Sequence, residues 1–117
     1  MSEMVSQQYL IANALNSIEQ NHELISQNIA NVNTPNYKSK QLDFADFLNK
    51  VRNGEADKEM LDKIPVEFIT GLQERKDGNN VDLDGQVSAL KKNALLFQTY
   101  SHLLASKMSI ARQSMSR

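Results

Sequence analysis

The sequence predicts a mainly α-helical protein, a long antiparallel coiled-coil hairpin of N- and C-terminal helices joined by a small irregular, partly extended middle segment. Apolar residues recur every 3.5 positions through residues 4–32 and again through residues 83–115, which is typical of helices that pack along one stripe. Residues 1–35 carry three acids and no Lys or Arg, whereas residues 86–117 carry five basic residues and no acid. These opposite charges predict that the two ends of the chain meet.

The first predicted segment is a heptad helix over residues 1–33. Its stripe contains two polar residues, Gln8 and His22. We expect His22 to be partly buried and hydrogen-bonded, fixing the register of the hairpin, with pH sensing as an alternative because imidazole titrates near neutrality. The helix should end before Pro35, which disfavours helical geometry at the residue before it, and Asn36 suits a left-handed turn.

The second predicted segment, residues 34–81, is a turn, a short helix and an irregular cap. Asp43 is a favourable N-cap for the short helix, and Gly54 is suited to end it. We expect further helical turns within 55–63 and a short extended piece over 64–69. Residues 73–80 are polar and rich in turn formers, which predicts a mobile loop. The short helix should present one apolar face: Phe44, Phe47, Leu48 and Val51.

The third predicted segment is a heptad helix over residues 82–117, capped by Asp82 or Asp84. It carries a second apolar row, broken only by Lys107, in addition to the stripe that faces the first helix. A two-helix hairpin can bury one stripe per helix, so this row predicts an interface with other chains. The residues of this predicted interface stripe are Leu96, Tyr100, Leu103 and Ile110.

Composition excludes several classes of function. The 117 residues fit a single domain. Thirteen basic and fourteen acidic residues give a net charge of −1, which argues against binding to nucleic acid. The absence of cysteine excludes disulfides, zinc–thiolate sites and thiol catalysis. The N-terminus lacks the basic and apolar regions of a cleaved signal peptide, and no apolar run approaches the roughly 20 residues of a membrane span.

The possible chemical motifs are weak. Residues 80–85 copy the first half of a calcium loop, but Lys91 stands where the bidentate Glu should be, so we interpret the acids as helix caps. In the predicted hairpin His22 and His102 lie about 13 Å apart along the axis, too far for one metal ion. No Ser–His–acid spacing and no Gly-rich phosphate loop is present. We therefore expect no catalytic, cofactor-binding or metal site, and no enzymatic activity.

Residues 25–38, ISQNIANVNTPNYK, resemble the signature S-x-N-I-A-N-x-x-T-P-G-Y of the axial proteins of the bacterial flagellar rod and hook. Residues 77–84 and 93–98 look like the proximal rod members of that family. Asn36 replaces the usual Gly, a mild change because Asn tolerates positive φ, and the middle segment looks short for the family. The assembly motif that this resemblance marks comprises Asn28, Ile29, Asn31, Asn33, Thr34, Pro35 and Tyr37.

The resemblance implies a structural subunit of the proximal rod that assembles helically, with the paired terminal helices forming the inner wall. It implies export through the flagellar type III channel without a cleaved signal, and a place in the periplasmic rod of the basal body. The implied partners are further copies of the chain, other rod proteins, the adaptor between rod and MS ring, and the export gate. Neither nucleic acid nor a direct membrane span is expected.

Two other interpretations stay open at this point. The chain could be a different rod subunit, or a soluble coiled-coil adaptor or secretion chaperone, although the latter has no need of the Asn-rich turn. The motif itself could simply end a helix, or could also contact a neighbouring subunit. We favour the second role, and expect Asn31→Ala to weaken assembly with rod partners while leaving the solubility of the isolated chain intact.

Overall fold

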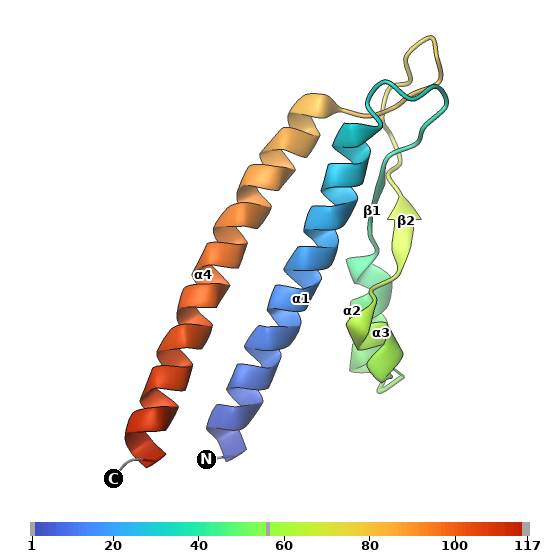
Figure 1. Ribbon diagram of the computed structural model, residues 1–117. Coiled ribbons are helices and arrows are strands. Elements are labelled where there is room, and N and C mark those ends of the chain that lie inside the picture. The colour runs from blue at the N-terminus through green and yellow to red at the C-terminus, as the bar shows by residue number, and fades with distance from the viewer. Residues whose placement is uncertain (1, 56, 116–117) are drawn as a thin grey trace.

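The computed structural model describes residues 2–55 and 57–115, which form an elongated molecule of 66 × 30 × 18 Å (Figure 1). Residues 1, 116 and 117, at the outer ends of the predicted segments 1–33 and 82–117, lie outside this description. The elements, in chain order, are α1 (Ser2–Ala30), β1 (Lys40–Leu42), α2 (Phe44–Arg52), α3 (Lys58–Asp62), β2 (Val66–Phe68) and α4 (Leu83–Met115).

The two long helices lie side by side and antiparallel, so that both ends of the chain are at the same end of the molecule (Figure 1). Their 29 and 33 residues correspond to lengths of about 43 and 50 Å at 1.5 Å per residue. This confirms the predicted mainly α-helical hairpin with a small, partly extended middle segment. None of the helices within the described residues has the length and apolarity needed to cross a membrane.

Burial along the hairpin is uneven. On α1 the buried side chains include Ile11, Ile18 and Ile25, as the stripe predicts. The described part of α4 buries only Gln86 and Asn93, both amides. Towards the C-terminus its predicted stripe becomes accessible: Phe97 is 41% exposed, Met108 47% and Met115 70%. The expectation that each helix buries a complete stripe against the other is therefore wrong for the distal half of α4.

The middle segment lies alongside α1 and does not form a cap at the end of the hairpin (Figure 1). Strands β1 and β2 pair antiparallel, with Gln41 opposite Glu67. The predicted location is wrong because Leu24, which is off the heptad stripe, gives α1 a second apolar face. Against that face the middle segment builds the buried core cluster of the molecule, formed by Leu24, Leu42 and Ile64 with Phe47 packed against it.

In the middle segment, the predicted start and end of the short helix are confirmed. The Asp43 carboxylate accepts a hydrogen bond from the Asp46 backbone N–H (3.0 Å) and begins α2. Gly54, at φ +73°, follows the last turn of α2, as expected for a glycine that ends a helix. The extended piece predicted over 64–69 contains β2, whereas its partner β1 was not predicted.

Candidate functional site

Asn28, in the last turn of α1, joins four parts of the molecule through one amide group. Its side chain is 1% exposed. The Nδ2 group donates to the Lys40 carbonyl (2.8 Å) and to the Gln86 Oε1 (3.1 Å). Its Oδ1 accepts from the Lys40 N–H (3.1 Å) and from the Tyr37 hydroxyl (2.9 Å). All the hydrogen-bonding positions of the amide are therefore used, and they bind α1 to β1, to α4 and to the turn.

Tyr37 completes this arrangement from the turn that follows α1. Its hydroxyl donates to Asn28, and its backbone carbonyl accepts from the Asn80 N–H (3.3 Å). Burial raises the pKa of the Tyr37 hydroxyl above 10.0, because the charged phenolate would lose hydration. The neutral hydroxyl is the form that can donate, so the environment favours the state on which the contact depends.

Asn31 and Thr34 close the turn at the end of α1 with their own side chains. The Asn31 Nδ2 donates to the Gln27 carbonyl (2.7 Å), and its Oδ1 accepts from the Thr34 hydroxyl (3.0 Å). The Thr34 N–H also donates to the Asn31 carbonyl (3.0 Å). The two side chains thus bond to each other and back to α1, whose Gln27 carbonyl also accepts from the Asn31 backbone N–H (3.1 Å).

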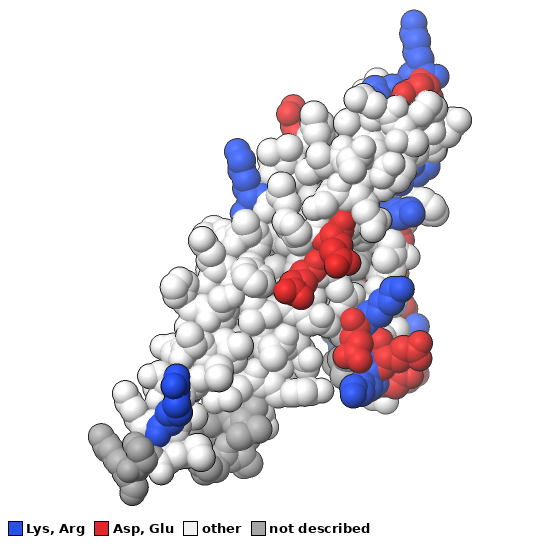
Figure 2. Space-filling model, viewed as in Figure 1, with Lys and Arg blue, Asp and Glu red and all other residues white. Residues whose placement is uncertain are grey.

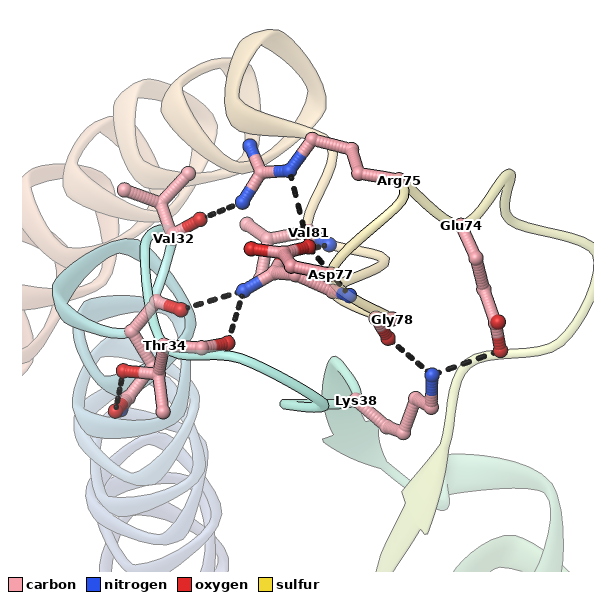
Figure 3. Close-up of polar contacts among 10 residues, drawn as sticks. Val32, Thr34, Lys38, Glu74, Arg75, Asp77, Gly78 and Val81 are labelled. Atoms are coloured by element: carbon pink, nitrogen blue, oxygen red, sulfur yellow. Dashed lines mark hydrogen bonds and ion pairs between the residues drawn. The ribbon is translucent and has the colours of Figure 1, made fainter.

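Asn79 is the residue that the sequence reasoning missed. It is fully buried, and its Nδ2 donates to the carbonyls of Asn31 and Thr34, both at 2.8 Å, while its Oδ1 accepts from the Val81 N–H (2.8 Å). Figure 3 shows Thr34 and Val81, which both take part in these contacts, close together at the end of α1. Residues 73–80, expected to be a mobile solvated loop, are instead folded back to cover this helix end.

Asn36 and Gly78 approach each other closely across this turn. Asn36 adopts φ +63°, the left-handed conformation expected for it, and its N–H donates to the Asp77 carbonyl (2.9 Å). Gly78 has φ +81°, and a Cβ at this position would lie 2.3 Å from the Asn36 Oδ1. The asparagine that replaces the signature's glycine is therefore accommodated by a glycine on the opposite side of the contact.

Two basic side chains at this end of the molecule, Lys38 and Arg75, are bonded within the chain. The Lys38 ammonium lies 2.7 Å from the Glu74 carboxylate and also donates to the Gly78 carbonyl (Figure 3). The Arg75 guanidinium donates to the Val32 carbonyl. These bonds tie residues 74–78 to the exit of α1.

The predicted assembly motif thus separates into an inner and an outer part. Asn33, Thr34 and Pro35 are exposed at the turn, although Thr34 also makes the hydrogen bonds described above. Ile29 is half-buried. The inner part, which bonds inside the chain, comprises Asn28, Asn31 and Tyr37.

The predicted interface stripe lies on α4 without a covering element among the described residues. Leu96 is 38% exposed, Leu103 40% and Ile110 48%, while Tyr100 is half-buried. No described side chain gathers these four residues into a buried core. Their surface is therefore open along α4, and its role as an interface stays a prediction.

His22 does not hold the register of the hairpin, because its side chain is exposed. The neighbouring Asn21 has that position: its Nδ2 donates to the Asn93 Oδ1 (3.1 Å), and the Asn93 Nδ2 donates to the Ile18 carbonyl (2.9 Å). At about 100° per residue, His22 lies roughly 40° to one side of the buried Ile18 and Asn21 roughly 60° to the other side, the side on which Asn93 of α4 lies.

The oxygen-rich residues 80–85 serve the backbone. The Asn80 Oδ1 accepts from the Ser39 N–H (2.7 Å), and the Asp82 carboxylate accepts from the Gly85 N–H (3.2 Å) at the start of α4. Asp82 is therefore the cap, one of the two expected. Ser39 is fully buried, and its Oγ is the one buried side-chain oxygen or nitrogen in the described part of the chain that lacks a hydrogen bond.

Among the described side chains, the two long helices meet by packing and amide contacts. The ion pairs among the side chains of residues 6–55, 57–60 and 62–115 are Lys38–Glu74, Lys50–Asp46 and Arg75–Asp77, and none of these joins α1 to α4. For these side chains, the expected attraction between an acidic first helix and a basic second helix is not seen as direct contacts. The exposed charges of both helices are left facing outward.

The asparagine-rich turn that ends α1 lies within a segment that this chain shares with a class of flagellar proteins. The family described as "Flagella basal body rod protein" matches residues 9–38. The flagellar basal body rod protein FlgB of Escherichia coli is 33% identical over 103 residues, covering 73% of this chain and 75% of that protein. The FlgB proteins of Yersinia ruckeri (31%, 86% and 89% covered) and Aquifex aeolicus (37%, 68% of each) are also similar.

The chain belongs to the FlgB family of flagellar basal body rod proteins. It is therefore a structural protein of the flagellum and not an enzyme. Family membership also removes the adaptor or secretion-chaperone interpretation, which gave no reason for the turn motif.

Proposed function

We propose that the chain is a subunit of the proximal rod, which assembles helically with copies of itself and with other rod proteins. In this position it would link the export gate and MS ring, through their adaptor, to the distal rod. The observation that carries the proposal is the exposed row Leu96, Leu103 and Ile110 on a helix that packs along only one side. A helical filament needs interfaces that do not close on themselves, and exposed rows of this kind supply them.

The two parts of the turn motif have different roles in this proposal. The inner asparagines and Tyr37 shape the exit from α1, because their bonding groups are used within the chain. The exposed outer residues, Asn33 and Pro35, contact the neighbouring subunit. Proline has little conformational entropy to lose, so it suits a contact that forms only on assembly.

The route to this position follows from the same proposal. The chain passes through the flagellar type III channel without cleavage of a signal and works in the periplasmic part of the basal body. A chain without cysteine cannot form disulfides in that oxidising compartment.

The test is complementation of motility in strains that each lack one rod gene. The wild-type gene should restore swimming to the strain lacking its FlgB-family gene, and the protein should be found in purified basal bodies. Restoration of a different rod deletion alone would instead support the alternative of another rod subunit.

Variants then test the exposed row. Leu103→Glu and Ile110→Glu should abolish swimming, because each places a charge in a surface that must be dehydrated on assembly. Ser109→Glu is the matched control, since Ser109 is exposed beside Ile110 but lies outside the row. Unchanged swimming with both row variants, at normal protein levels, would contradict the proposal.

A further inference from the structure

A cleft of about 610 Å³ opens between the middle of α1 and α4. Its α4 wall includes Ala94 and Phe97, the latter 41% exposed, and its α1 wall includes Ile18. The cleft is therefore apolar at its base. The remaining lining residues are polar: Glu19, His22, Glu23, Asn93 and Gln98.

The rim of this cleft is acidic on the α1 side. Glu19 and Glu23 are exposed, and neither pairs with a cation anywhere in the described residues. Figure 2 shows acidic side chains midway along the hairpin on an otherwise uncharged stretch of surface. An apolar cleft with two carboxylates on its rim suits an apolar surface that carries a single positive charge.

The chain offers such a surface on another side of α4. Lys107 is the single charge that interrupts the predicted interface stripe, and its ammonium has no partner within the described chain. Lys107 follows Gln98 of the cleft by nine residues, and Leu103 follows Ala94 by nine. At 100° per residue those pairs are about 180° apart, whereas Lys107 is only about 40° from Asn93 and 80° from Phe97, so on average the row lies roughly 130° around α4 from the cleft.

We propose that the cleft receives the Lys107 row of a second copy of this chain, with the ammonium held between Glu19 and Glu23. This inference rests on the proposed assembly into a rod and names one contact within it. Lys107 lies about 12 residues beyond the cleft along α4, which sets an axial offset of about 18 Å between neighbouring copies. Because the two contact faces differ and lie on different sides of the hairpin, the contact is heterologous, repeats from copy to copy and does not close as a two-fold dimer.

The test uses a carbodiimide, which joins an ammonium directly to a carboxylate, on a concentrated equal mixture of 15N-labelled and unlabelled chain. Mass spectrometry should find Lys107 linked to Glu19 or Glu23 in mixed-isotope pairs, which form only between copies. Copies of the Lys107→Glu variant can still be linked through other amines and carboxylates. The yield of these linked oligomers should fall about tenfold, because the attraction that brings the copies together is lost. Arg112→Glu is the matched control, because it makes the same charge change on another side of α4 and should have little effect.

The triple variant Lys107→Glu, Glu19→Lys, Glu23→Lys restores opposite charges and should recover oligomer formation. Links from Lys107 to other acids, equal effects of Lys107→Glu and Arg112→Glu, or no recovery in the triple variant would each overturn the inference. These outcomes are distinct from failure of the proposed function, which is decided by whether the wild-type gene restores swimming. A chain that swims but is linked through Lys107 to a different rod protein would keep the function and reject this contact.

Discussion

The two ends of the hairpin are built differently. At the turn end, buried amides of Asn28, Asn79 and Gln86 bond across segments far apart in sequence. At the open end, where the termini lie together (Figure 1), Leu103 and Met115 are 40% and 70% exposed. The turn end is held together by hydrogen bonds within one chain, whereas the open end leaves apolar surface in contact with water.

This difference shows that two kinds of interaction have different roles. Hydrogen bonds fix how the helices are arranged, and apolar contacts remove surface from water. Hydrogen bonds are directional, so the amides of Gln86 and Asn93 hold α4 in one register against α1. Apolar burial is non-directional and depends only on the area removed from water. A helix positioned by amides can therefore leave its apolar rows for neighbouring subunits, which is what a rod protein needs.

Among the variants that test this difference between the two ends, Asn28→Ala should have the largest effect on stability. The change removes four hydrogen bonds and leaves buried partners unsatisfied, so we expect the free energy of unfolding to fall by about 3 kcal/mol. Urea unfolding followed by circular dichroism measures it. The control is Asn33→Ala, an exposed asparagine of the same motif, which should change stability little. Equal effects of the two variants would mean that the turn end is not held by its amides.

Gly78→Ala should have a smaller but specific effect. The new Cβ would meet the Asn36 Oδ1 at 2.3 Å, and alanine is strained at φ +81°, so we expect a loss of about 2 kcal/mol. Gly71→Ala is a matched control, because Gly71 has the same φ and its added Cβ would meet nothing within 4 Å. The difference in melting temperature between the variants isolates the contact. Identical melting temperatures would show that the turn can shift to make room for the added methyl group.

Local chemistry made much of the fold predictable. The stripe positions Ile11, Ile18 and Ile25 are buried because helical periodicity places them on one face. Asp43 begins α2 and Asp82 caps α4 because a short carboxylate can accept from backbone N–H groups three residues on. These signals act within a few residues, so a single sequence contains all the information they need.

The missed features depend on contacts between distant segments. Asn79 and Asn80 look like solvated turn residues, and become buried only because the loop folds back over the end of α1. Strand β1, Lys-Gln-Leu, has three residues and one apolar side chain, too short for an alternating pattern; it forms because β2 pairs with it and Leu24 lies beneath. The sequence identifies the motif, but only the fold shows which of its residues bond inside the chain and which are exposed.

The variant with the smallest expected effect on stability lies at the open end. Leu103→Gln should change the free energy of unfolding of the isolated chain by less than about 0.5 kcal/mol, because Leu103 is 40% exposed and belongs to no buried cluster. Urea unfolding at low protein concentration gives the value. Ile25→Ala, at a buried position of α1, should cost about 3 kcal/mol in the same assay. If Leu103→Gln were as costly as Ile25→Ala, the row would already be packed within one chain, and no apolar surface would remain to drive assembly.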